Sequence, residues 1–114
     1  MIELDRKVFE LCKPEGVIAD GDYLEAPVNV WTGTGIRPMA PWSPSTRWED
    51  LEPEIRKACD DEKHCFACTY RPDKWYGEFT DLPQLIGNHV GFGESACEAA
   101  VRALIALKES EAKP

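Results

Sequence analysis

Four side chains that commonly bind zinc lie within ten residues of this chain: Cys59, His64, Cys65 and Cys68. The run 64–70 alternates like a β-strand, so Cys65 and Cys68 should point to opposite faces, roughly 10 Å apart. Two ligands of one zinc ion lie within about 4 Å of each other. We therefore expect structural thiols and no metal site. If that expectation fails, these four residues are the expected ligands.

The two histidines, His64 and His89, offer a second chemistry, because an imidazole can act as the base for a cysteine nucleophile. Cys65 or Cys97 could supply the thiol, but the sequence provides neither a third member nor a sharp turn that would expose the nucleophile. We therefore predict no catalytic residue and a chain that is not an enzyme. A small metal- or thiol-dependent enzyme built on the Cys59 to Cys68 cluster is the alternative.

No motif predicts a cofactor. The run Gly91-Phe92-Gly93-Glu94-Ser95 precedes a predicted helix, and the free N–H groups of a helix start can hold an anion. Glu94 and Glu98 would repel a phosphate at this point, and turn and cap requirements explain the glycines and the serine. We expect no bound cofactor.

A hairpin and a capped helix are the clearest elements that could position these side chains. Residues 64–70 and 75–80 alternate about Arg71-Pro72-Asp73-Lys74, which predicts a four-residue hairpin loop. The side chains expected on the core face are Phe66, Cys68, Tyr70, Trp75, Gly77 and Phe79, and those on the opposite face are Ala67, Thr69, Tyr76 and Glu78. Ser95 and Glu98 form a capping box for an amphipathic final helix. Residues 81–92 between them read as a loop that could contain a short strand at 89–92.

Three further elements are predicted upstream. A first helix should span about residues 3–13, because Pro14 and Gly16 stop it. A strand is expected near 26–31, close to a sheet edge because of Pro27, and a proline-rich loop follows over 32–45. The middle helix starts either at a Thr46–Glu49 capping box or at an Asp50 cap. Its expected core stripe is Trp48, Leu51, Ile55 and Ala58 or Cys59.

These elements predict an α+β fold: a small antiparallel sheet of three to four strands packed with about three helices, in the order α-β-α-β-β-α. The 114 residues suit a single domain over 1–114. Within it, residues 1–22 should form the N-terminal helix and a connection, and 109–114 a frayed tail.

The overall charge limits the partners. A formal net charge of −8 repels phosphate groups, so we expect no direct binding of nucleic acid. No apolar run approaches the roughly 20 residues that cross a bilayer, so no membrane partner is expected. Five cysteines without a secretory signal favour reduced thiols and a cytoplasmic location.

Two segments together resemble the phage ABA-sandwich family of small bacteriophage and prophage proteins. They are Pro41-Trp42-Ser43-Pro44-Ser45-Thr46 before the middle helix and Gly91-Phe92-Gly93-Glu94-Ser95-Ala96-Cys97-Glu98-Ala99-Ala100 at the last helix, and the likeness covers about residues 23–108. The resemblance implies helices packed on a small antiparallel sheet and a phage or prophage origin. It carries over no functional residue.

Residues 64–108 are also similar to HicB-type antitoxins, through two strands, a glycine-containing loop and Gly93-x-Ser95-x-x-Glu98-Ala99 opening a helix. No DNA-binding tail is expected after this helix. The likeness therefore implies shared architecture only.

The expected function is that of a non-enzymatic phage accessory protein that binds a host protein, and could inhibit a nucleic-acid-binding or defence complex, in the host cytoplasm. Tryptophan is favoured at interface hot spots, and Trp42 is the tryptophan expected to be exposed. The predicted contact residues are Trp42, Asp60, Asp61 and Glu62, with the acidic surface facing a basic partner. A structural role as a homodimer, through an unpaired sheet edge, is a further alternative.

Overall fold

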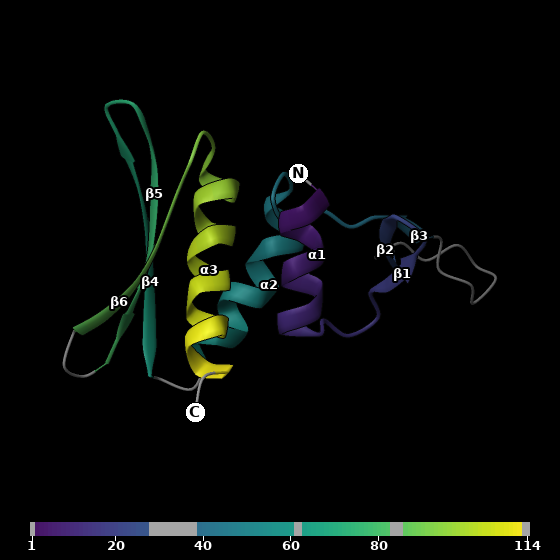
Figure 1. The fold of residues 1–114 in the computed structure, drawn as a ribbon, viewed down its shortest axis with the longest axis horizontal. Helices are drawn as coiled ribbons and strands as arrows, with labels where there is room; N and C mark the ends of the chain where they lie inside the picture. The colour runs from purple at the N-terminus through teal and green to yellow at the C-terminus, as the bar shows by residue number, and fades with distance from the viewer. Residues whose placement is uncertain (1, 28–38, 61–62, 83–85, 113–114) are drawn as a thin grey trace.

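The described part of the chain forms three helices and six strands (Figure 1). The computed structural model describes residues 2–27, 39–60, 63–82 and 86–112. In chain order the elements are α1 (Ile2–Cys12), β1 (Ile18–Asp20), β2 (Tyr23–Pro27), β3 (Met39–Pro41), α2 (Trp48–Cys59), β4 (His64–Arg71), β5 (Lys74–Asp81), β6 (Ile86–Gly93) and α3 (Ala96–Ala112). The predicted α+β class is confirmed. The strands form two three-stranded antiparallel sheets, where the sequence predicts one sheet of three to four strands.

Strands β4, β5 and β6 form an antiparallel sheet in which β5 is central. The predicted hairpin register is confirmed: Phe66 lies opposite Phe79, and Cys68 opposite Gly77. Arg71 pairs with Lys74, so the hairpin loop contains two residues and not the predicted four. β6 is an eight-residue strand where the sequence predicts mainly a loop.

Helix α3 packs very close to this sheet because glycines face it. A Cβ atom at Gly91 would lie 2.5 Å from the Ala99 carbonyl oxygen, and one at Gly77 would lie 2.9 Å from the same oxygen. Ala99 and Ala103, one helical turn apart, are fully buried on α3. Small residues on both sides therefore bring the helix backbone almost into contact with the strands.

The same helix also contacts α1 and α2, so it lies at the centre of the molecule (Figure 1). Its buried residues are Ala99, Ala100, Val101, Ala103, Leu104, Ile105 and Leu107. A helix that is apolar on most of its circumference is stable only when elements cover it on several sides. Val8 of α1, Leu51 of α2 and Phe79 of β5 complete the core around it. None of the described helices has the length and apolar character needed to cross a membrane.

The smaller sheet, β1-β2-β3, lies at the other end of the molecule, beyond α1 (Figure 1). The strand predicted near 26–31 begins earlier, at Tyr23, and it is the central strand, not an edge strand. Pro27 is tolerated at its end, where it pairs only with Met39 of β3. Residues 28–38, which include the first half of the predicted loop, lie outside the described residues.

The start of α2 differs from both predicted caps. The helix begins at Trp48 and its N-cap residue, Arg47, makes no side-chain capping hydrogen bond. The Asp50 carboxylate instead accepts a hydrogen bond from the Ser43 backbone N–H at 2.9 Å, and the Thr46 hydroxyl lies 2.7 Å from the Ser43 hydroxyl. Both polar side chains therefore stabilise the preceding turn.

The serine half of the capping box predicted for α3 is confirmed, whereas Glu98 bonds the backbone N–H of Glu94 in place of that of Ser95. Ser95 Oγ accepts a hydrogen bond from the Glu98 N–H at 3.1 Å, and Glu98 Oε2 accepts one from the Glu94 N–H at 3.1 Å. The helix continues to Ala112 and so includes residues 109–112, whose fraying stays a prediction.

Candidate functional site

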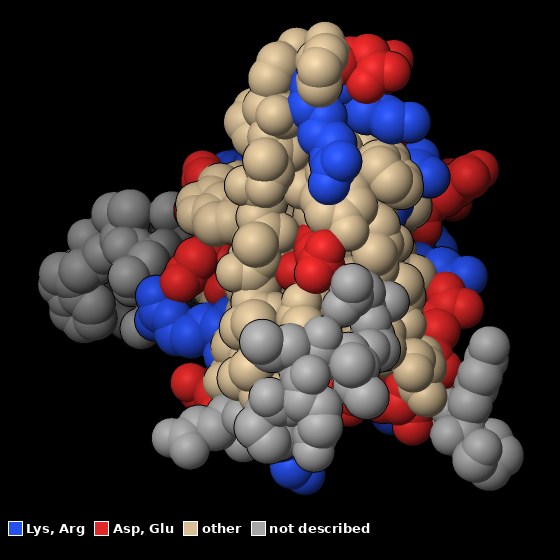
Figure 2. Space-filling view, turned by 90° about the vertical axis from the view of Figure 1, so that its left-hand side faces the viewer, with Lys and Arg blue, Asp and Glu red and all other residues tan. Residues whose placement is uncertain are grey.

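The face of the β4–β6 sheet that points away from α3 is open, because the described helices all lie on the other side (Figure 1). Figure 2 looks onto this face. Uncharged residues occupy most of it, Lys and Arg side chains gather toward the end with the β4–β5 hairpin, and a small acidic group lies near its middle. We refer to this surface as the open sheet face; its outward side chains are Cys65, Ala67, Thr69, Arg71, Lys74, Tyr76, Glu78, Thr80, Val90 and Phe92.

Two aromatic rings with a cation over each lie on the part of the open sheet face next to the β4–β5 hairpin. Tyr76 lies directly opposite Phe92 on the neighbouring strand, with ring centroids 5.1 Å apart. The Arg71 guanidinium lies 4.4 Å from the centroid of Tyr76, and the Lys74 ammonium lies 4.6 Å from that of Phe92. The cations reach the rings because residues at diagonal cross-strand positions share a face.

Glu78 is hydrogen-bonded to two neighbouring hydroxyl groups on the open sheet face. Its carboxylate accepts hydrogen bonds from the Tyr76 hydroxyl at 2.5 Å and from the Thr80 hydroxyl at 2.7 Å. These two bonds, the Tyr76 bond above all, lower the pKa of Glu78, and the same carboxylate raises the pKa of Tyr76. Glu78 is therefore ionised and Tyr76 neutral at physiological pH.

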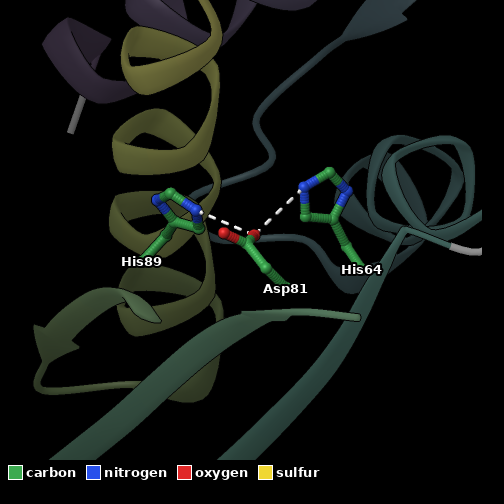
Figure 3. Close-up of side chains that lie close together, drawn as sticks. All are labelled: His64, Asp81 and His89. Atoms are coloured by element: carbon green, nitrogen blue, oxygen red, sulfur yellow. Dashed lines mark hydrogen bonds and ion pairs between the residues drawn. The ribbon is translucent and has the colours of Figure 1, made fainter. Parts of the chain in front are cut away.

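A second cluster lies on the opposite, helix-facing side of the sheet. The Nε2 atoms of His64 and His89 lie 3.3 Å and 3.1 Å from the same Asp81 oxygen, Oδ1 (Figure 3). One ring nitrogen of each histidine and a carboxylate oxygen all lie within 4.8 Å of one another. The histidine side chains are 12% and 14% exposed, whereas Asp81 is 38% exposed.

Strand register brings these three residues together. His64 is the first residue of β4 and Asp81 the last of β5, and they lie directly opposite each other. His89 lies opposite Phe79, two residues before Asp81, and alternation places all three side chains on one face. The register of β6 shifts between Phe79 and Asp81, an irregularity that often re-aims a side chain. The sequence singles out both histidines but not Asp81.

The exposure predicted for Trp42 is wrong. Trp42 is 6% exposed, its ring packs edge-on against Phe9 at a centroid distance of 6.5 Å, and its backbone N–H donates to the Leu24 carbonyl at 2.8 Å. Trp48, predicted to belong to the core stripe of α2, is instead 45% exposed. Trp42 therefore lacks the exposure on which its predicted contact role depends.

The predicted acidic contact surface is described only in part. Asp60 is exposed at the C-terminal end of α2, and Asp61 and Glu62 lie outside the described residues. Many other carboxylates pair with neighbouring cations; these ion pairs are Glu49–Arg47, Glu52–Arg56, Glu54–Lys57, Glu98–Arg102 and Glu109–Lys7. Each of these carboxylates already has a cationic neighbour, with which a basic partner would have to compete.

The cysteines predicted as alternative zinc ligands do not converge. Cys65 is exposed on the open sheet face, whereas Cys68 points toward α3, where its Sγ lies 3.9 Å from the Ala96 carbonyl oxygen. Among the described residues, the set of potential ligands that includes His64 contains Asp81 and His89 and no cysteine. Burial raises the pKa of the Cys68 and Cys97 thiols, and it raises that of Cys12 to about 11.

Thiol labelling should follow this difference in environment. In the native protein at pH 8 we expect a disulfide reagent such as DTNB to react first with the exposed Cys65 and last with Cys12. A pKa of about 11 leaves roughly one Cys12 thiol in a thousand ionised at pH 8, and the fraction rises tenfold per pH unit up to that value. Mass spectrometry of digests taken over time measures the order. Early labelling of Cys12 would contradict the packing of α1 against the core.

No protein-family model, curated protein or solved structure matches this chain.

Proposed function

We propose that this chain is a non-enzymatic binding protein that contacts a partner protein through the open sheet face. The observation that carries the proposal is the aromatic pair Tyr76–Phe92 with Arg71 and Lys74 over its rings. Aromatic residues and arginine are enriched at the centres of protein interfaces. Because the contacts around these rings already hold them, little side-chain entropy would be lost on binding.

The charge on this face favours an acidic partner. Its outward side chains include two cations, Arg71 and Lys74, and one carboxylate, Glu78, whereas the whole chain carries a net charge of −8. A partner surface that combines carboxylates with apolar side chains would complement both the cations and the rings. The proposed contact surface thus differs from the acidic surface that the sequence suggests.

The open sheet face suits a protein partner better than a nucleic-acid partner. Bases bind open sheets by stacking on exposed aromatic faces, but here Arg71 and Lys74 lie over the faces of Tyr76 and Phe92, so a stacking base would have to displace a cation. The Glu78 carboxylate beside them would repel a phosphate backbone. The resemblance to phage ABA-sandwich proteins makes a bacterial host protein, met in the host cytoplasm, the partner class that we propose.

A photo-cross-linking amino acid at Thr69, which is exposed on the open sheet face, tests the proposal. In a bacterial lysate we expect it to capture one protein, which the same cross-linker at the exposed Arg56 of α2 does not capture. With the captured protein purified, the double variant Arg71→Glu, Lys74→Glu should bind it at least about tenfold more weakly.

The matched control is Arg56→Glu, Lys57→Glu, which changes the net charge equally but on α2, and should leave the affinity unchanged. Three results would overturn the proposal: cross-links only to nucleic acid, cross-links only to a second copy of this chain, or equal weakening by both double variants.

A further inference from the structure

We propose that His64 Nε2, Asp81 Oδ1 and His89 Nε2 form a binding site for one divalent transition-metal ion, for which Zn²⁺ is the best match. The site lies on the face of the sheet opposite to the open sheet face and does not depend on partner binding. Two imidazoles and one carboxylate are a donor set that zinc and similar ions accept.

The distances agree with this assignment. Zinc binds imidazole nitrogen and carboxylate oxygen at about 2.0 to 2.2 Å, so neighbouring ligand atoms in a tetrahedral site are about 3.3 Å apart. The two Nε2 atoms lie 3.3 Å and 3.1 Å from Asp81 Oδ1. The ligand nitrogens of the two imidazoles lie within 4.8 Å of each other. Only this pair of atoms would have to move closer together when an ion binds.

The exposures of the three side chains favour an ion that has one coordination position open to solvent. The histidines are largely buried, whereas the Asp81 side chain is more than one third exposed. Three protein ligands and an opening to solvent leave a fourth tetrahedral position for water. The ligands come from three different strands, so a bound ion would join the paired ends of β4 and β5 to the middle of β6 (Figure 3).

The competing explanation is a hydrogen-bonded trio in which the Asp81 carboxylate accepts a hydrogen bond from the Nε2–H of each imidazole. The two explanations differ in what added metal does. If a metal binds, each Nε2 atom coordinates it through its lone pair and any proton on that atom is released to solvent, because a ligating imidazole nitrogen must be deprotonated. If the trio only forms hydrogen bonds, the ring nitrogens keep their state when metal is added.

The experiment uses the full chain after treatment with a chelator, titrated with ZnCl₂. Calorimetry should give one ion per chain, and NMR of the ring nitrogens should show Nε2 of both His64 and His89 shifting at one equivalent. Loss of an outer-shell partner weakens metal binding by roughly 10- to 100-fold. Asp81→Asn and His89→Gln each remove a direct ligand, so each should weaken Zn²⁺ binding by at least that much. The control variant Cys65→Ser, Cys68→Ser should bind Zn²⁺ as the wild type does.

Two results would overturn the proposal: ring nitrogens that do not shift at one equivalent, or Zn²⁺ binding that survives His89→Gln and is lost in the thiol variant. The NMR measurement is made on the wild-type protein, so it decides the question even if a ligand variant fails to fold. Circular dichroism of each metal-free variant separates loss of a ligand from loss of structure.

Discussion

Replacing Gly91 with alanine should destabilise the protein by at least about 3 kcal/mol, at the upper end of the cost of overpacking. The added Cβ would lie 2.5 Å from the Ala99 carbonyl oxygen and 2.6 Å from Arg102 Cβ, and would also meet the Ala103 nitrogen. Two of these three atoms belong to the backbone of α3, so no side-chain rotation relieves the clash. The helix must move away from the sheet, which opens the core. Urea unfolding followed by circular dichroism measures the change.

Gly21 supplies the matched control. A Cβ atom there would meet no atom within 4 Å, although the residue has a φ of +60° that favours glycine. Gly21→Ala should therefore cost only about 1 kcal/mol, from backbone strain. If Gly91→Ala costs no more than Gly21→Ala, the close approach of α3 to β6 is wrong.

Replacing Asp5 with alanine should cost about 3 kcal/mol. The Asp5 carboxylate of α1 is 5% exposed, and it accepts hydrogen bonds from the Ser45 N–H at 2.8 Å and the Ser43 hydroxyl at 2.7 Å. Hydrogen bonds to a charged group contribute about 1.5 to 3 kcal/mol each, and removal of the acceptor leaves the Ser45 N–H without its partner. Thermal or urea unfolding of the variant measures this loss.

Two variants separate this contact from other effects of the charge. Glu3, on the same first turn of α1 but exposed, has the same relation to the helix dipole, so Glu3→Ala should change the stability by less than about 1 kcal/mol. Asp5→Asn keeps one acceptor oxygen and should fall between Asp5→Ala and the wild type. Equal effects of Asp5→Ala and Glu3→Ala would show that the carboxylate does not hold the Ser43–Ser45 turn.

Local patterns in the sequence predict the hairpin and the last helix well. The alternation through 64–80 and the Ser95–Glu98 cap depend on neighbouring residues only, and both are found in the structure. The outward positions of Tyr76 and Glu78 follow from the same alternation. Phe92 joins them only through pairing with β6, because residues 81–92 contain glycines that also suit a loop.

The tryptophans show where local pattern is insufficient. Helical spacing places Trp48 on the same face as Leu51 and Ile55. Spacing along one helix gives the direction of a side chain, but it does not show whether other elements of the fold reach far enough to cover it. Trp48 is the first residue of α2, and there it is left exposed. Trp42 is buried by Phe9, which is 33 positions away in the chain, and such a contact leaves no trace in a short window.

Sequence patterns fail to identify Asp81 for a similar reason. Its meeting with His89 depends on the register of β5 against β6, and that register shifts between Phe79 and Asp81. A single irregularity of this kind changes which residues face one another. The sequence shows two histidines and many acids, and only the pairing of the strands selects one acid among them.

The central position of α3 also determines when the chain can fold during synthesis. Its residues, 96–112, are made after both sheets and the other two helices, yet they contact β5, β6, α1 and α2. Until this segment leaves the ribosome, Phe79 and Leu51 have no central helix to cover them, and the nascent chain exposes apolar surface. Folding is therefore completed after translation of residue 112, and a ribosome stalled before residue 96 should carry a chain that is sensitive to proteases and able to bind chaperones.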